Sequence, residues 1–176
     1  MKARGTPLDL RHWTLYALLG TIMLLSKVIT EPIPNVHLLA VFTVTFTVVY
    51  RKYALIPIYF FVFLVGLIYA GFSTWWVPYL YLWTVLWGVA MLLPRNMKPQ
   101  VAIPVYMLVC GLHGLAYGTL YAPCQALFFG LNFKGTLAWI AAGFPWDCIH
   151  AASNFCLGVL VFPLVKLMTK LEEKFF

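Results

Sequence analysis

Charged residues are scarce in this chain, and their scarcity excludes a soluble domain. Asp, Glu, Lys and Arg make up 10% of the 176 residues, whereas hydrophobic residues make up 63%. A soluble globular domain carries about 25% charged residues. At roughly 20 residues per crossing, the chain has room for about six transmembrane helices and no separate hydrophilic domain. We therefore expect an all-α polytopic membrane protein, folded as one six-helix bundle over residues 1–176.

Motifs for enzymatic chemistry are also lacking. The chain has no P-loop, so we do not expect it to hydrolyse ATP, and it has no GxSxG, HExxH or paired-carboxylate motif. Its four cysteines have no CxxC spacing, and we interpret them as small apolar residues of the membrane core. The net charge of +7 is divided among short loops, which is typical of a topology signal rather than of a nucleic-acid site. We expect no cofactor and no catalytic or metal site.

Helix breakers divide the apolar sequence into segments. Asn35 is a candidate cap for the second span, and Pro145 a candidate first residue for the sixth. Pro123, Gly130 and Gly135 interrupt the region between spans five and six, which predicts a long extracellular loop with a short interfacial helix. The predicted spans cover residues 12–30, 34–50, 53–72, 76–93, 101–120 and 145–168, with the loop at 121–142.

The distribution of basic residues predicts the orientation. Ten of the twelve Lys and Arg residues fall on the side of the termini, and only Lys27 and Lys134 fall on the other. Because Lys and Arg concentrate in cytoplasmic loops, both termini are expected to be cytoplasmic. No internal repeat is visible, which argues against an inverted-repeat transporter.

A polar stripe marks the start of the sixth predicted span. Asp147, His150 and Asn154 are three and four residues apart, so they share one face of a helix. Asp147 is the one acidic residue well inside an apolar run, and ionisable groups in such places are candidates for function.

Other polar and aromatic residues are expected at the same, outer end of the bundle. Together with the stripe they predict an outward-facing pocket under the fifth loop, because ligand sites combine apolar walls with a few placed polar groups. The candidate substrate-binding residues are Asp147, His150, Asn154, Trp139, Trp75, Trp76, Tyr79, Trp83, Asn35 and His37.

Each candidate also has a structural interpretation. Asp147 in a first helical turn would complement the helix dipole, and His150 could bond Asp147 or a backbone carbonyl. Asn154 could join two helices, and tryptophans at span ends normally lie at the membrane surface. Gly111, Gly114 and Gly118 form a small-residue face, which serves either close packing inside the bundle or the docking of a membrane partner.

The segment that runs from Trp139 to Leu167 resembles the final helix of S components, the substrate-binding membrane subunits of energy-coupling factor (ECF) transporters. Many of these open their last span with G-I/L-P-F/W-D-x-x-H-A/G-x-x-N and close it with an apolar-Pro-Leu element. The matching positions are Gly143, Pro145, Trp146, Asp147, His150, Ala151 and Asn154, followed by Pro163 and Leu164. Chain length, six spans and cytoplasmic termini are also similar to that family.

The resemblance implies a subunit of a bacterial or archaeal cell membrane that captures a scarce nutrient from outside. It would work with a separate transmembrane scaffold subunit and two cytoplasmic ATPases. Metal-specific members have a histidine after the initiator methionine; here that position is Lys2, so cobalt or nickel is not expected. The aromatic candidates favour a small flat nutrient such as a pterin, deazapurine, flavin, thiamine precursor or nicotinate-like ring.

Three other functional classes stay open. Asp147 and His150 could relay protons in a proton-coupled carrier, or serve a membrane-embedded hydrolase. A purely structural subunit would need neither residue to be accessible. Ligand co-purification distinguishes binding from structure, and dependence of uptake on an ATPase distinguishes ECF import from proton coupling.

Overall fold

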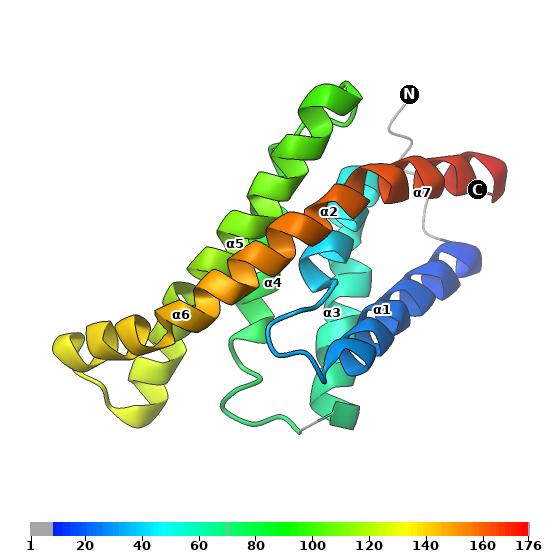
Figure 1. The fold of residues 1–176 in the computed structure, drawn as a ribbon. Helices are drawn as coiled ribbons and strands as arrows, with labels where there is room; N and C mark the ends of the chain where they lie inside the picture. Colours follow the sequence, from blue (N-terminus) through cyan, green and yellow to red (C-terminus); the bar gives the residue numbers. More distant parts are fainter. Residues whose placement is uncertain (1–8, 70, 176) are drawn as a thin grey trace.

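The computed structural model describes residues 9–69 and 71–175, and these form helices joined by turns, without strands (Figure 1). Lys2 and Arg4, which contribute to the charge count, lie outside the described residues. The predicted all-α class is confirmed. The α-helices are α1 (Leu10–Thr30), α2 (Leu39–Tyr50), α3 (Leu55–Leu64), α4 (Tyr79–Met91), α5 (Pro99–Phe129), α6 (Phe133–Leu157) and α7 (Val161–Phe175). Short 3₁₀ helices form η1 (Arg51–Ala54) and η3 (Gly158–Leu160), and a short π-helix forms η2 (Val65–Tyr69).

In the described residues, four stretches are long and apolar enough to cross a bilayer, which makes this a membrane-embedded protein. They cover Leu10–Thr30, Leu39–Ile68, Pro99–Phe129 and Phe133–Phe175. The second contains a break at Arg51, whose φ of 55° ends α2 and starts η1. Helix α4 has 13 residues and is shorter than a full crossing. The count of six crossings therefore stays a prediction.

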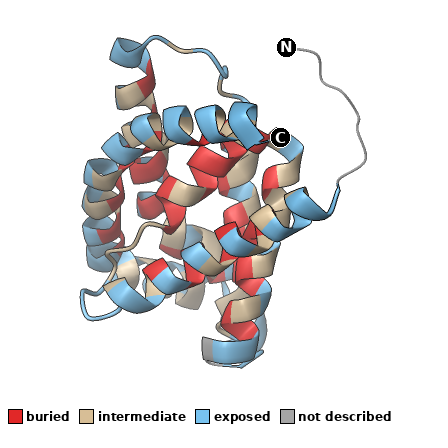
Figure 2. Ribbon diagram, turned by 90° about the vertical axis from the view of Figure 1, so that its right-hand side faces the viewer, coloured by how far each residue is buried: buried red, intermediate tan, exposed pale blue. Residues whose placement is uncertain are grey.

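Helix α2 lies at the centre of the molecule. Ten of its twelve residues are buried, and it packs against α4, α7, α5 and α1. A helix that is apolar all round belongs in a core, where every face meets a neighbour. The buried faces of the other helices turn toward the same interior, whereas their outer faces are exposed (Figure 2). The buried Thr47 hydroxyl group donates a hydrogen bond to the Thr43 carbonyl oxygen at 2.6 Å.

The predicted loop at 121–142 is wrong, because most of it is helical. Helix α5 continues to Phe129 and α6 begins at Phe133, so the two form a hairpin whose tip projects from the bundle (Figure 1). Gly130 makes the tight turn with a φ of 64°, a left-handed conformation that glycine adopts without steric cost. Asn132 caps α6 by accepting a bond from the Gly135 N–H at 2.8 Å.

Two smaller expectations also change. Pro145 lies inside α6 and is not its first residue. Asn35 does not cap α2, which begins at Leu39 after the N-cap residue Leu38; Asn35 instead takes a φ of 60° in the preceding turn. Pro163 falls in the first turn of α7, a position that tolerates proline, and the break before it is the short turn η3.

The glycine face of α5 packs inside the hairpin. A Cβ at Gly114 would lie 2.8 Å from the His150 carbonyl oxygen, and one at Gly111 would lie 3.1 Å from the Phe155 Cβ. Further along, a Cβ at Gly158 would lie 2.7 Å from the Met107 Cα. The small residues therefore let the α5 and α6 backbones approach closely, as the packing interpretation predicted.

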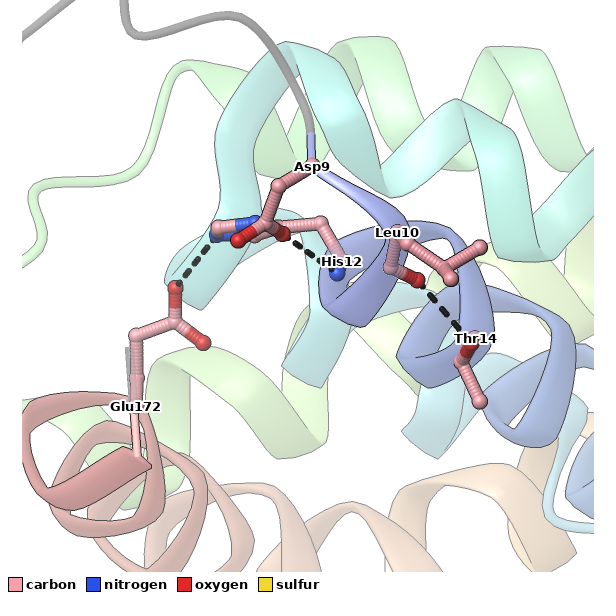
Figure 3. Close-up of polar contacts among 5 residues, drawn as sticks. All are labelled: Asp9, Leu10, His12, Thr14 and Glu172. Carbon is pink, nitrogen blue, oxygen red and sulfur yellow. Dashed lines mark hydrogen bonds and ion pairs between the residues drawn. The ribbon is translucent and has the colours of Figure 1, made fainter.

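The start of α1 is held near the end of α7 by polar contacts (Figure 3). Asp9 caps α1 by accepting a bond from the His12 backbone N–H at 3.0 Å, and the His12 ring lies 2.6 Å from the same carboxylate oxygen. On its other side the ring lies 3.8 Å from Glu172 of α7. These contacts place the described ends of the chain at the same side of the molecule.

Candidate functional site

The polar stripe of α6 faces α5 and is buried. Asp147, His150 and Asn154 are 6%, 3% and 0% exposed. Asp147 lies in the middle of α6, so the proposed pairing with a helix N-terminus is wrong. Its Oδ1 instead accepts a bond from the Gly118 backbone N–H of α5 at 3.1 Å. A Cβ at Gly118 would overlap this carboxylate, so the contact requires a residue without a side chain.

A cluster of aromatic rings surrounds His150. The centroid of its ring lies 4.6 Å from the ring of His37 and 4.8 Å from the ring of Tyr117. His37 in turn lies 6.1 Å from Trp83, and Trp83 lies 5.7 Å from His113. We call these five residues, together with the buried Asn154 one turn after His150 on α6, the histidine cluster. Its members come from the turn before α2 and from α4, α5 and α6.

Most members of the histidine cluster have a buried polar atom without a hydrogen-bond partner in the protein. These atoms are His37 Nδ1, Trp83 Nε1, His113 Nδ1, His150 Nε2 and both amide atoms of Asn154. Such groups are rare in native structures, because each one costs the desolvation of a donor or acceptor. Their gathering at one place from several segments is typical of a site that recognises a polar ligand.

Two of these atoms, His113 Nδ1 and Trp83 Nε1, can be assigned as hydrogen-bond acceptor or donor. His113 Nε2 lies 3.2 Å from the Leu82 carbonyl oxygen, which can only accept, so Nε2 carries the proton and donates. In the neutral ring His113 Nδ1 is then an acceptor, whereas Trp83 Nε1–H is a donor only. The Asn154 side chain offers both a donor, its amide NH2 group, and an acceptor, its amide oxygen. The cluster therefore offers both hydrogen-bond donors and acceptors between flat aromatic rings.

Three of the remaining predicted residues, Tyr79, Trp75 and Trp139, lie at the edge of the histidine cluster. Tyr79 extends the cluster, since its ring lies 5.7 Å from Trp83 and 5.5 Å from Trp75. Trp139 stacks on Tyr121 at 6.1 Å and 19°, and the Tyr121 hydroxyl donates to the Trp75 carbonyl at 2.6 Å.

Trp76 and Asn35 lie outside the cluster. Trp76 points toward α3, where its Nε1 donates to the Val62 carbonyl at 2.8 Å. Asn35 occupies the turn before α2, where its left-handed backbone conformation is its clear contribution. The structure thus brings His37, Trp83, His150 and Asn154 together, joins Tyr79, Trp75 and Trp139 to their edge, and leaves these two residues aside.

Sequence reasoning missed the contribution of α5. His113, Tyr117 and Tyr121 are each four residues apart, so they share one helix face beside Gly114 and Gly118. This spacing was visible in the sequence. Without the hairpin contact, however, nothing indicated that this face meets the stripe of α6.

The cluster is filled by its own side chains. Trp83 is 1% exposed and packs edge-on against Phe61 of α3 at 6.2 Å. A ligand would therefore enter by separating ring contacts such as the one between His37 and His150. Within residues 9–69 and 71–175, no three His, Cys, Asp or Glu side chains are arranged to hold a metal ion.

Comparisons with protein-family models, with curated proteins and with solved structures find no match to this chain. The function has to be inferred from the chemistry of the histidine cluster and from the architecture around it.

Proposed function

We propose that this protein is the substrate-capturing subunit of an ATP-driven importer of the ECF type, and that it binds a small flat nitrogen heterocycle in the histidine cluster. The observation that carries the proposal is the set of buried, unpartnered donors and acceptors at His37, Trp83, His113, His150 and Asn154. Aromatic rings enclose these atoms and offer stacking surfaces, each worth about 0.5–1.5 kcal/mol beyond burial.

The proposal includes the architecture expected of such a subunit. The chain crosses a bacterial or archaeal cell membrane six times, with both termini in the cytoplasm. Arg95, Lys98, Lys166 and Lys170 line one hollow at one end of the molecule, whereas Lys134 lies at the far end of α5 beside the hairpin turn. This segregation supports the sidedness. The scaffold subunit and the two ATPases are separate chains.

The resemblance to S components supports the same function. The first part of its motif, Gly143 to Asn154, lies on α6, and three of the matching residues, Asp147, His150 and Asn154, are buried. By contrast, Trp146 of the same motif is 57% exposed. The buried members are therefore the ones suited to bind a substrate.

Ligand recovery tests the proposal. We expect protein purified from its native host in a mild detergent to retain a heterocycle that mass spectrometry identifies. Asn154→Leu keeps the volume but removes both polar atoms, and Trp83→Phe removes the indole N–H. Each change leaves a ligand group unpaired at a cost of about 1–3 kcal/mol, so each should weaken binding roughly tenfold.

Trp146→Phe is the matched control, because it makes the same change at an exposed position of α6. If both cluster variants folded and bound the ligand as tightly as the control, the site would lie elsewhere. Import provides the second test: accumulation in cells should stop when the ATPase partners are deleted, whereas binding by the isolated protein should continue.

A proton-coupled carrier is the second candidate, favoured by one contact. His37 and His150 lie with ring centroids 4.6 Å apart, close enough to exchange a proton through a ligand or a water molecule. Uptake that continued without any ATPase and collapsed with the proton gradient would favour this function. The hydrolase hypothesis needs Asp147 and His150 to pair as acid and base. The Asp147 carboxylate instead accepts a hydrogen bond from the Gly118 N–H, and His150 Nε2 has no hydrogen-bond partner in the protein.

A further inference from the structure

A second polar site lies at the end of the molecule where α5 begins. A hollow of about 560 Å³ opens between the segment before α5 and the side of α7. Among the described residues, four cationic side chains line it, namely Arg95, Lys98, Lys166 and Lys170, and no carboxylate does. This hollow, the basic hollow, is distinct from the histidine cluster and shares no residue with it.

The fold concentrates these charges. Lys166 and Lys170 are one turn apart on α7, so both project from the same face. Lys98 is the N-cap residue of α5, whose 31 residues place the positive end of a long helix dipole at the same hollow. In the described part of the chain, no salt bridge joins any of the four cations to a carboxylate.

The acidic residues nearest in sequence do not line the basic hollow itself. Glu172 and Glu173 both line an adjoining hollow that also contains Arg95, and Glu172 lies 3.8 Å from the His12 ring of α1. Four like charges around one space repel one another, and a bound anion relieves this repulsion. The charges that line the basic hollow therefore favour an anionic ligand.

Apolar side chains form the rest of the wall of the basic hollow. Phe162, Val165 and Met97 line it, and the Lys166 ammonium lies 4.7 Å above the Phe162 ring. Helix α5 is long and apolar enough to span the bilayer and begins here at Pro99. The hollow therefore lies where a span ends, at the level of lipid headgroups, with cations beside an apolar wall.

We propose that the basic hollow binds the phosphate group of an anionic phospholipid, with the acyl chains against its apolar wall. A phosphate ester supplies the negative charge and the acceptor oxygens that lysine and arginine bind. Basic pockets between helices at a membrane surface bind acidic headgroups through this combination. A free phosphate shares the headgroup chemistry but makes no use of the apolar wall. This inference does not depend on the nutrient-binding function.

Native mass spectrometry of the full-length protein in detergent tests the proposal. The protein is titrated with dioleoyl phosphatidylglycerol or with dioleoyl phosphatidylcholine, which has the same chains but no net charge. We expect selective retention of phosphatidylglycerol, and a loss of affinity of roughly tenfold or more in Lys166→Gln/Lys170→Gln. Lys166→Arg/Lys170→Arg keeps the charge and should retain the lipid.

The matched control is Lys52→Gln/Lys174→Gln, which removes the same charge from outside the basic hollow. Equal losses in the two glutamine variants, or equal retention of the two lipids, would refute the site and assign the binding to overall charge. Inorganic phosphate provides the remaining comparison: it should not displace the lipid at millimolar concentration. Displacement with the same dependence on Lys166 and Lys170 would overturn the lipid assignment in favour of a free phosphate.

Discussion

Replacing Gly118 with alanine tests the contact between α5 and α6 on which the candidate site depends. The Gly118 N–H donates to Asp147 Oδ1 at 3.1 Å, and an added Cβ would overlap the same carboxylate. The substitution therefore forces Asp147 to move and weakens its hydrogen bond. Gly88 of α4 and Gly143 of α6 are matched controls, because a Cβ at either position meets nothing within 4 Å.

The size of the effect follows from three opposing contributions. Overpacking costs about 1–3 kcal/mol, and loss of a hydrogen bond to a charged group costs about 1.5–3 kcal/mol. Alanine in place of glycine stabilises a helix interior by about 1 kcal/mol. The net effect of Gly118→Ala is a loss of about 1.5–5 kcal/mol, nearer the lower value if the carboxylate can rotate. Each control substitution should instead stabilise the protein by about 0.5–1 kcal/mol.

Thermal unfolding in detergent measures these differences. For a chain of this length, 1 kcal/mol corresponds to about 2–4 °C in Tm. We expect Gly118→Ala to lower the Tm by at least about 3 °C, whereas Gly88→Ala and Gly143→Ala should raise it by about 1–4 °C. In an Asp147→Ala background the Gly118 substitution should lose most of its cost, because the overlapping carboxylate is gone. A Tm for Gly118→Ala at or above that of the controls would refute the reasoning.

Three further predictions concern the hairpin, the orientation and the start of α1. Gly130→Ala should destabilise the protein by roughly 1–2 kcal/mol in the same unfolding assay, because a φ of 64° strains a residue with a Cβ; an unchanged Tm would contradict the turn. A cysteine introduced at Lys134 should react with an impermeant maleimide in intact cells, and one at Lys98 should not. Labelling at Lys98 would contradict the predicted orientation. The hydrogen bond from the His12 backbone N–H holds the pKa of Asp9 below its usual value of 3.8. The cap therefore stabilises α1 above that pH and is lost as pH falls through the lowered pKa, which hydrogen exchange at the His12 amide, relative to neighbouring helical amides, should detect.

Sequence pattern alone predicted the membrane class and the polar face of α6. Both depend on local properties: the scarcity of charge over whole segments, and the spacing of Asp147, His150 and Asn154 along one helix. The same kind of reasoning failed at residues 121–142. Pro123, Gly130 and Gly135 predicted a loop, yet only Gly130 lies in the turn between α5 and α6. A single proline removes one backbone hydrogen bond, and packing against a neighbouring helix compensates for that loss.

The partners of the polar stripe were decided by tertiary structure. Asp147 met the Gly118 N–H rather than a helix N-terminus, because the unpredicted first half of α6 placed it in the middle of a helix. His113 became a neighbour of Trp83 only through the packing of α5 on α4. The physical reason is the distance along the chain over which each property acts. Composition and helical spacing act over a few residues and can be read along the chain. Which helix faces meet depends on the close fit of small residues such as Gly114 against a distant backbone, and that fit exists only in the folded molecule.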